Sequence, residues 1–261
     1  MTQTRRRELS PFLVSIQADP DGQPGENGTL REALDACLEQ AQHLAIEQVA
    51  KTIFPYAVWK RIQNAQGTRQ DLYEYYKRYL PDYVAMAPSK NNLGTYFARL
   101  IGYGLDPKTG GQVDHLPSGC LNFEGNQLEF IIAACKPGAQ RMALQTAIYD
   151  PVRDQREARR HFPCLQHLTF TRDTRRQTLT LNAFYALQLL FEKAYGNWLG
   201  LMRLGSFVAG ETGLRFDRLN CYAGVQKMSG ENRPKEDVTA LERLIEIATT
   251  CAQSTSELVA Q

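Results

Sequence analysis

The sequence has few of the residues that build metal or redox sites. Of its 261 residues only four are histidine, and its six cysteines are scattered without a Cys-x-x-Cys pair. No histidine stands at metal-ligand spacing from another candidate ligand, so no metal site is expected. Because no leader-like apolar segment precedes the cysteines, we expect reduced thiols in a cytoplasmic protein.

A long apolar run and a dense basic face are missing as well. The most apolar stretch, 194–209, contains Arg203 and several glycines and is too short and polar to span a bilayer. The formal net charge is only +2, with both signs interspersed, which disfavours a dedicated nucleic-acid binder. A membrane protein is therefore not expected, and a small or neutral partner is favoured over nucleic acid.

Apolar material for a core is ample. Hydrophobic residues make up 43% of the chain, enough for one large domain or two small ones. No linker divides the chain convincingly, so we interpret 1–261 as a single domain. Within it, 1–28 is expected to be a partly flexible N-terminal segment around a strand-like stretch at 12–16, because a Gly, Pro, Asp and Asn cluster ends it.

Helix signals dominate the first half of the chain. A helix is predicted over 29–42, with Thr29 and Glu32 at capping-box spacing, and another over 126–135. A tyrosine-rich run at 71–83 has partly helical spacing. It could be a stacking platform for bases, but such a stripe is more typical of a packing face.

The second half contains the best candidate for chemistry. Pro163 leads Cys164 into an extended run, which forms a predicted hairpin with 177–182 and places Cys164 at the outer end of the first strand. Residues 183–211 follow as a predicted long, buried helix. Cys164 is either a small buried hydrophobe or a nucleophile. The preceding charged segment, 153–160, is either a solvated surface or an anion clamp.

The order of these elements resembles the thymidylate synthase superfamily, which includes deoxycytidylate hydroxymethylases. The likeness covers roughly 90–228. Pro163-Cys164 matches the nucleophile motif of the family, and Asn197 falls about where the family has the asparagine that reads the pyrimidine ring. Further matches are Leu93-Gly94-Thr95-Tyr96, Asn126-Gln127-Leu128, Arg141 at the phosphate-gripping arginine, Thr146-Ala147-Ile148 and Glu211-Thr212-Gly213-Leu214.

The sequence also departs from the family pattern. Leu165 stands where the family has a histidine directly after the nucleophile, and an apolar stretch around Phe184 replaces an expected arginine. The histidine and tyrosine that hold the sugar in the family fall near Lys227, and 236–261 lacks a tail like the one that closes over folate. The substrate is therefore left open among a free nucleotide, a nucleoside and a base within a polymer.

The resemblance implies an α/β (α+β) fold and a reaction. The fold would be a large twisted mixed sheet covered by helices on one face, with sheet-to-sheet packing in a homodimer. The reaction would be addition of a cysteine thiolate to C6 of a pyrimidine nucleotide or nucleoside, then methyl or hydroxymethyl transfer to C5. The implied carbon donor is 5,10-methylenetetrahydrofolate. The alternative is a catalytically altered or inactive relative, a nucleotide-binding or dimeric scaffold protein.

Six residues are the predicted site. Cys164 would be the nucleophile, and Glu47, an early acid within an apolar segment, is either the general base or a plain helix-surface glutamate. Gln166 shares the strand face of Cys164. The predicted substrate-binding residues are Asn197, Tyr195, Gln166 and Arg141, the last as a cation for phosphate or, alternatively, a salt-bridge partner.

Overall fold

The fold is a mixed α/β arrangement, seen in a computed structural model that describes residues 8–86, 94–104, 108, 122–136, 138, 140–155, 163–228, 239 and 242–250. Its strands are β1 (Glu8–Leu9), β2 (Phe12–Gln17), β3 (Gln145–Ala147), β4 (Leu165–Asp173), β5 (Thr178–Leu189) and β6 (Arg215–Lys227). Its helices are α1 (Gly28–Gln40), α2 (Ile46–Ala50), α3 (Tyr56–Asn64), α4 (Arg69–Met86), α6 (Tyr96–Ile101), α7 (Gln127–Ala134), α8 (Pro151–Asp154) and α9 (Tyr195–Glu211). Short 3-10 segments lie at Asn122–Gly125 and Arg141–Ala143, and a π-helix at Leu190–Ala194.

One six-stranded mixed sheet organises the molecule. The strand order is β1-β6-β5-β4-β3, with β2 also paired to β6. All pairs are antiparallel except β5 with β6, which are parallel. A parallel pair needs a crossover connection, and here the π-helix and α9 supply it. The predicted hairpin is confirmed as β4 and β5, with Cys164 directly before β4.

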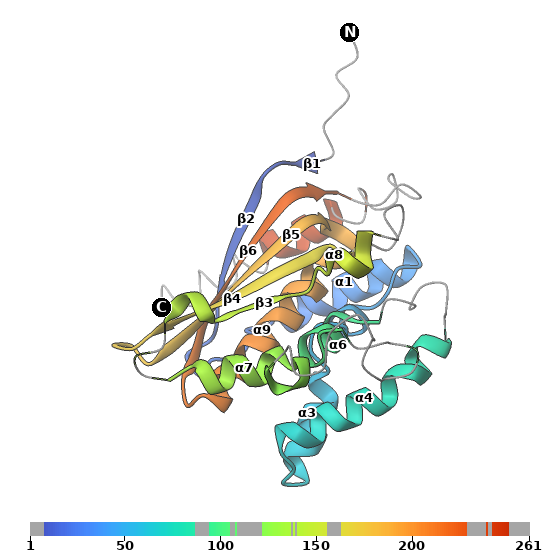
Figure 1. Ribbon diagram of the computed structural model, residues 1–261. Helices are drawn as coiled ribbons and strands as arrows, with labels where there is room; N and C mark the ends of the chain where they lie inside the picture. The colour runs from blue at the N-terminus through green and yellow to red at the C-terminus, as the bar shows by residue number, and fades with distance from the viewer. Residues whose placement is uncertain are drawn as a thin grey trace.

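Helices cover one face of this sheet. Figure 1 shows α1, α3, α4, α6, α7 and α9 on the same side of the strands. On β5 the buried Leu181 and Tyr185 point to that side, whereas Phe184 is 38% exposed on the other. Phe184 stacks on Tyr222 with ring centroids 5.3 Å apart. The sheet face without helices therefore carries partly exposed aromatic side chains. That this face packs against a second subunit stays a prediction.

Helix α9 lies at the centre of the core, and glycines let its neighbours approach it closely. A Cβ at Gly200 would lie 2.6 Å from the carbonyl oxygen of Ala50 in α2. On the sheet side, a Cβ at Gly205 would overlap the Phe216 ring of β6. Because Gly200 and Gly205 have no Cβ, α9 can pack closely against α2 on one side and against the sheet on the other.

The prediction of one helix over 183–211 is wrong in its first part. Strand β5 continues to Leu189, the π-helix follows, and α9 begins only at Tyr195. Because β5 is an interior strand between β4 and β6, its apolar residues at 183–189 are needed for packing. A short apolar run has no periodicity that separates a buried strand from a buried helix. The longer strand places three further residues beside Cys164, as described below.

Two smaller predictions are also corrected. The cap of α1 is Asn27, whose side chain accepts a hydrogen bond from the Leu30 amide at 3.1 Å, and not Thr29. Asp154, expected in a charged loop, lies at the end of α8 and is fully buried. It forms an ion pair with Arg99, so at least this acid is structural. The helix predicted over 126–135 is confirmed as α7, capped by Asn126.

Candidate functional site

Cys164 lies at a junction of strands and helices. Pro163 and Cys164 run directly into β4, and the carbonyl oxygen of Cys164 accepts a hydrogen bond from the Ala186 amide of β5 at 3.0 Å. The register between β4 and β5 shifts between Leu165 and His167. Such a bulge redirects side chains at the end of a strand. The half-buried Cys164 side chain borders a cavity there.

This cavity, called the Cys164 cavity below, has a volume of about 320 Å³. Its walls come from four parts of the chain: the α2 region, α6 with the residues just before it, the start of β4, and the end of β5 with the π-helix and the first turn of α9. The described residues that line it are Leu44, Val49, Thr52, Gly94, Thr95, Tyr96, Arg99, Pro163, Cys164, Leu187, Gln188, Leu189, Lys193 and Asn197. A mostly apolar hollow with a few convergent polar groups is typical of a small-molecule site.

The cavity brings together the two residues on which the family resemblance depends most. Cys164 precedes β4, and Asn197 is in the first turn of α9, where it is only 6% exposed. Both line the same cavity. A carboxamide offers one acceptor and two donors, so Asn197 can recognise a ring edge that carries both kinds of group. Two residues of the predicted site therefore line one cavity, and their roles as nucleophile and ring-recognising amide stay predictions.

Burial and one cavity residue, Lys193, set the pKa of the Cys164 thiol. Burial raises the pKa of Cys164, and the Lys193 ammonium partly opposes this shift. Burial, followed by the neighbouring Cys164, also raises the pKa of the Tyr96 hydroxyl well above its usual value. Like an ordinary tyrosine, Tyr96 is protonated near neutral pH, so its hydroxyl is able to donate a hydrogen bond. The sequence pattern did not single out Lys193, and it pointed to Tyr96 only as part of a family-like segment.

Alkylation of Cys164 by iodoacetamide is expected to be half-maximal at a pH above the ordinary thiol value of about 8.5, because only the thiolate reacts. Lys193→Met removes the cation that lowers the pKa, so its midpoint should lie higher still. Mass spectrometry of the Cys164 peptide across a pH series measures both midpoints. Lys60→Met, a change at a lysine that stacks on Tyr56 and does not line the cavity, is the control. A midpoint for Lys193→Met at or below that of the wild type would contradict this account.

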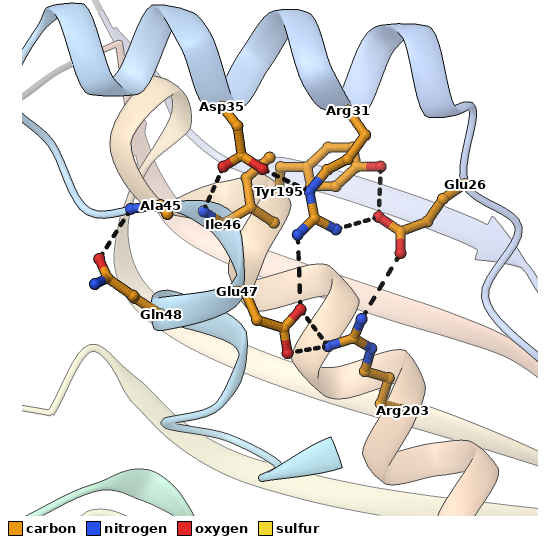
Figure 2. Close-up of polar contacts among 9 residues, drawn as sticks. All are labelled: Glu26, Arg31, Asp35, Ala45, Ile46, Glu47, Gln48, Tyr195 and Arg203. Carbon is orange, nitrogen blue, oxygen red and sulfur yellow. Dashed lines mark hydrogen bonds and ion pairs between the residues drawn. The ribbon is translucent and has the colours of Figure 1, made fainter. Parts of the chain in front are cut away.

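Glu47 and Tyr195 belong to a separate polar network (Figure 2). Both carboxylate oxygens of Glu47 accept from Nη1 of Arg203, at 2.7 and 2.8 Å. Nη2 of Arg31 lies 3.6 Å from Glu47, and the Tyr195 hydroxyl donates to Glu26 at 3.1 Å. Neither Glu47 nor Tyr195 is among the described residues that line the Cys164 cavity. The network joins α1, α2 and α9 and so holds one wall of the cavity in place.

Glu47 does line a second cavity next to the first. This cavity, called the tyrosine cavity below, has a volume of about 250 Å³. Its described lining residues are Glu47, Lys51, Thr52, Pro55, Ala57, Val58, Tyr75, Tyr76, Tyr79, Tyr83 and Thr95. Thr52 and Thr95 line both cavities. The Thr95 hydroxyl lies 2.7 Å from the Tyr76 hydroxyl. A hydrogen bond therefore holds one of the two residues that the cavities share.

The remaining predicted site residues are Gln166 and Arg141. Gln166 is partly buried on β4, and its carbonyl oxygen accepts from the amides of Ile148 and Tyr149 at 2.9 and 3.2 Å. It is not among the described lining residues of the Cys164 cavity. Arg141 lies in the segment Arg141–Ala143, but its side chain is outside what the structure describes. Their proposed contacts with substrate stay predictions.

Arg99 and Gln188 are cavity residues that the sequence did not single out. Arg99 forms two hydrogen bonds with Asp154, at 2.7 and 2.8 Å, so it holds the wall of the cavity. Gln188 is one of the strand residues that were assigned to a helix, and this error concealed it. In the part of the chain that the structure describes, no group of three or more His, Cys, Asp or Glu side chains could hold a metal ion. None of the described helices is both long and apolar enough to cross a membrane.

Comparison with known proteins does not assign the chain to a family. No family model matches the sequence, and no curated protein is significantly similar to it.

Proposed function

We propose that the Cys164 cavity binds a pyrimidine nucleotide or nucleoside and that Cys164 adds to C6 of the ring, so that a one-carbon group is transferred to C5. The observation that carries this proposal is that Cys164 and Asn197 line one cavity. They are the nucleophile and the ring-recognising amide of the thymidylate-synthase-like resemblance. The cavity also supplies a cation, Lys193, and a protonated phenol, Tyr96.

The cavity residues have distinct roles in this chemistry. Sγ of Cys164 forms a bond to C6, and the electrons of the C5–C6 double bond move to C5 and the C4 carbonyl oxygen. Tyr96, which lines the cavity and is protonated near neutral pH, would donate a hydrogen bond to a ring oxygen as it gains charge. After C5 has bonded the one-carbon unit, the C5 proton passes to solvent and the bond between that unit and the donor nitrogen breaks. A hydride from the donor, for methyl transfer, or water, for hydroxymethyl transfer, then adds to the unit as the C5–C6 double bond re-forms and Cys164 leaves as a thiolate.

The tyrosine cavity fits the carbon donor that the resemblance implies. Methylenetetrahydrofolate contains flat aromatic rings, and when bound it supplies the one-carbon unit and, for methyl transfer, a hydride. Tyrosine faces stack on such rings, and Tyr75, Tyr76, Tyr79 and Tyr83 line this cavity. Because Thr52 and Thr95 line both cavities, a donor in the tyrosine cavity would lie beside the pyrimidine.

The test is covalent capture with 5-fluoro-2′-deoxyuridine 5′-monophosphate and methylenetetrahydrofolate. Fluorine cannot leave C5 as a cation, so the adduct at Cys164 should persist and appear as added mass under denaturing conditions. Cys164→Ala should form no adduct. The control is Cys37→Ala, which removes another half-buried thiol away from the cavity and should react as the wild type does. No adduct with the wild type, or an adduct that survives Cys164→Ala, would refute the proposal.

A second candidate is a relative that binds nucleotide without turnover. Two observations favour it: burial raises the pKa of Cys164, and Glu47 is engaged by Arg203 instead of facing the thiol. Calorimetry with deoxyuridine monophosphate, together with release of tritium from its C5 position, separates the two functions. Binding without tritium release or adduct formation would support the scaffold, whereas release would support catalysis.

A further inference from the structure

A third cavity lies between α3 and α9. It has a volume of about 260 Å³ and shares none of its described lining residues with the Cys164 cavity or the tyrosine cavity. The α3 residues that line it are Tyr56, Trp59, Lys60 and Gln63. The α9 residues that line it are Arg203, Ser206, Phe207, Gly210 and Glu211. Both sets have the spacing of a single helix face, so the two helices form a groove, called the α3–α9 groove below.

The two helices run in the same direction along this groove. Cζ of Arg203 lies 4.6 Å from the centre of the Tyr56 ring, and one turn further on the Trp59 and Phe207 rings meet edge to face with centroids 5.1 Å apart. Because the order of contacts is the same in both helices, their carboxyl ends lie at the same end of the groove. Glu211, the last residue of α9, lies at that end, and Arg203 lies at the other.

Two cations mark the Arg203 end of the groove. Nζ of Lys60 lies 5.4 Å from the centre of the same Tyr56 ring over which Arg203 lies. Arg203 forms ion pairs with Glu47 and Glu26, but neither carboxylate is among the described residues that line the groove. No carboxylate of the described residues forms an ion pair with Lys60. The Arg203 end therefore presents positive charge to the groove and favours an anionic group there.

The Glu211 end has an excess of negative charge. Arg69 is shared by two carboxylates, because it donates to Glu211 at 2.9 Å and to Glu129 at 2.6 and 3.2 Å. One negative charge of these three side chains is therefore not neutralised within the group. The carboxyl ends of α3 and α9 add the negative poles of their helix dipoles. Since Glu211 is the described member of the group that lines the groove, this end favours a cationic group.

We propose that the α3–α9 groove binds a small zwitterion, an ω-amino carboxylate whose carboxylate contacts Lys60 and Arg203 and whose ammonium contacts Glu211. Helix α9 rises by about 12 Å between Arg203 and Glu211, at 1.5 Å per residue. Charges separated by several methylene groups suit this distance better than those of an α-amino acid, which share one carbon. The rings of Trp59 and Phe207 lie between the two ends and offer apolar surface to the methylene chain. This site goes beyond the proposed function and does not depend on it.

The first part of the test compares three small molecules by ligand-observed NMR with the full chain. 6-Aminohexanoate is expected to bind in the millimolar range, because a ligand with so few atoms gains little binding energy. Hexanoate and hexylamine each lack one of the two charges, so each should bind about three- to fivefold more weakly, as for loss of a surface ion pair. Equal affinity for all three molecules, or no saturable binding of 6-aminohexanoate, would overturn the proposal.

The second part of the test changes the groove. Lys60→Met removes one cation, so 6-aminohexanoate should bind about threefold more weakly, whereas hexylamine should bind as it does to the wild type. A Cβ at Gly210 would meet no described atom of a neighbouring element within 4 Å, so a larger side chain fits there without a clash. In Gly210→Leu this side chain would take up part of the groove, and affinity for 6-aminohexanoate should fall at least about tenfold.

The matched control is Lys136→Met, a change at an exposed lysine that does not line the groove. Its affinity for 6-aminohexanoate should equal that of the wild type, and circular dichroism checks that each variant is folded. Wild-type affinity in Gly210→Leu would mean that the molecule binds elsewhere and would overturn the groove as its site. The same affinity in Lys60→Met as in Lys136→Met would overturn the role of Lys60.

Discussion

Replacing Arg99 by methionine should lower the free energy of unfolding by about 3–5 kcal/mol, as expected when one member of a buried ion pair is removed. The Arg99 side chain is 7% exposed and that of Asp154 is 0% exposed. Nη1 and Nη2 of Arg99 donate to the two carboxylate oxygens at 2.7 and 2.8 Å, and Nη1 also donates to the Ile148 carbonyl at 2.8 Å. The variant would leave a carboxylate in the interior, and among the described residues only the Asp150 amide, at 2.8 Å, would still donate to it. Urea unfolding followed by circular dichroism measures the change.

The control for Arg99→Met is an ion pair at the surface. Arg218 lies 2.8 Å from Asp217, but its side chain is 40% exposed. Arg218→Met should therefore change stability by less than about 1 kcal/mol. Replacing Arg99 and Asp154 together by apolar residues should recover part of the loss, because no charge is then buried alone. If Arg99→Met were no more destabilising than Arg218→Met, the pair would not hold α6 to α8.

Loss of the Arg99–Asp154 ion pair would also change the geometry of the candidate site. Arg99 lines the Cys164 cavity, and it lies on the same helix as Tyr96. Asp154 fixes that helix against the segment that follows β3. A weaker attachment of α6 would displace the Tyr96 hydroxyl from the thiol. The ion pair thus connects a structural role at the edge of the sheet to the geometry around Cys164.

The sequence identified the local features of this site better than its long-range contacts. The hairpin that begins after Cys164 follows from residues close together in the chain, and it is confirmed. Cys164 and Asn197 line one cavity, and their roles stay predictions. The environment of Glu47 does not follow in this way. Its partner Arg203 is far along the chain, and nothing near Glu47 indicates that the acid is held in an ion pair. The sequence therefore suggested a general base at Glu47, whereas in the fold this carboxylate forms an ion pair with Arg203.

The error over residues 183–189 had a larger consequence for the site. Since interior strands and buried helices are both continuously apolar, the sequence of β5 could not exclude a helix. The strand assignment places Leu187, Gln188 and Leu189 together in the cavity wall. It also aligns Gln188 with Gln226, a pairing between strands that no local pattern encodes.

Gly200→Ala should lower the free energy of unfolding by about 1–3 kcal/mol, the usual cost of overpacking a core. The new Cβ would lie 2.6 Å from the Ala50 carbonyl oxygen and 3.0 Å from Cβ of Ile53. Backbone cannot rotate out of the way as a flexible side chain can, so α2 and α9 must move apart. Chemical denaturation at equilibrium measures the loss.

The same substitution in the last turn of α9 separates this effect from helix propensity. A Cβ added at Gly210 would have no described atom of a neighbouring element within 4 Å, so Gly210→Ala should raise stability by about 0.5–1 kcal/mol. Val49 and Thr52, on or just after α2, line the Cys164 cavity. Separation of α2 from α9 should therefore also weaken nucleotide binding in Gly200→Ala, whereas Gly210→Ala should bind as the wild type does. Equal stability of the two variants would mean that the close approach of α2 to α9 does not shape the cavity.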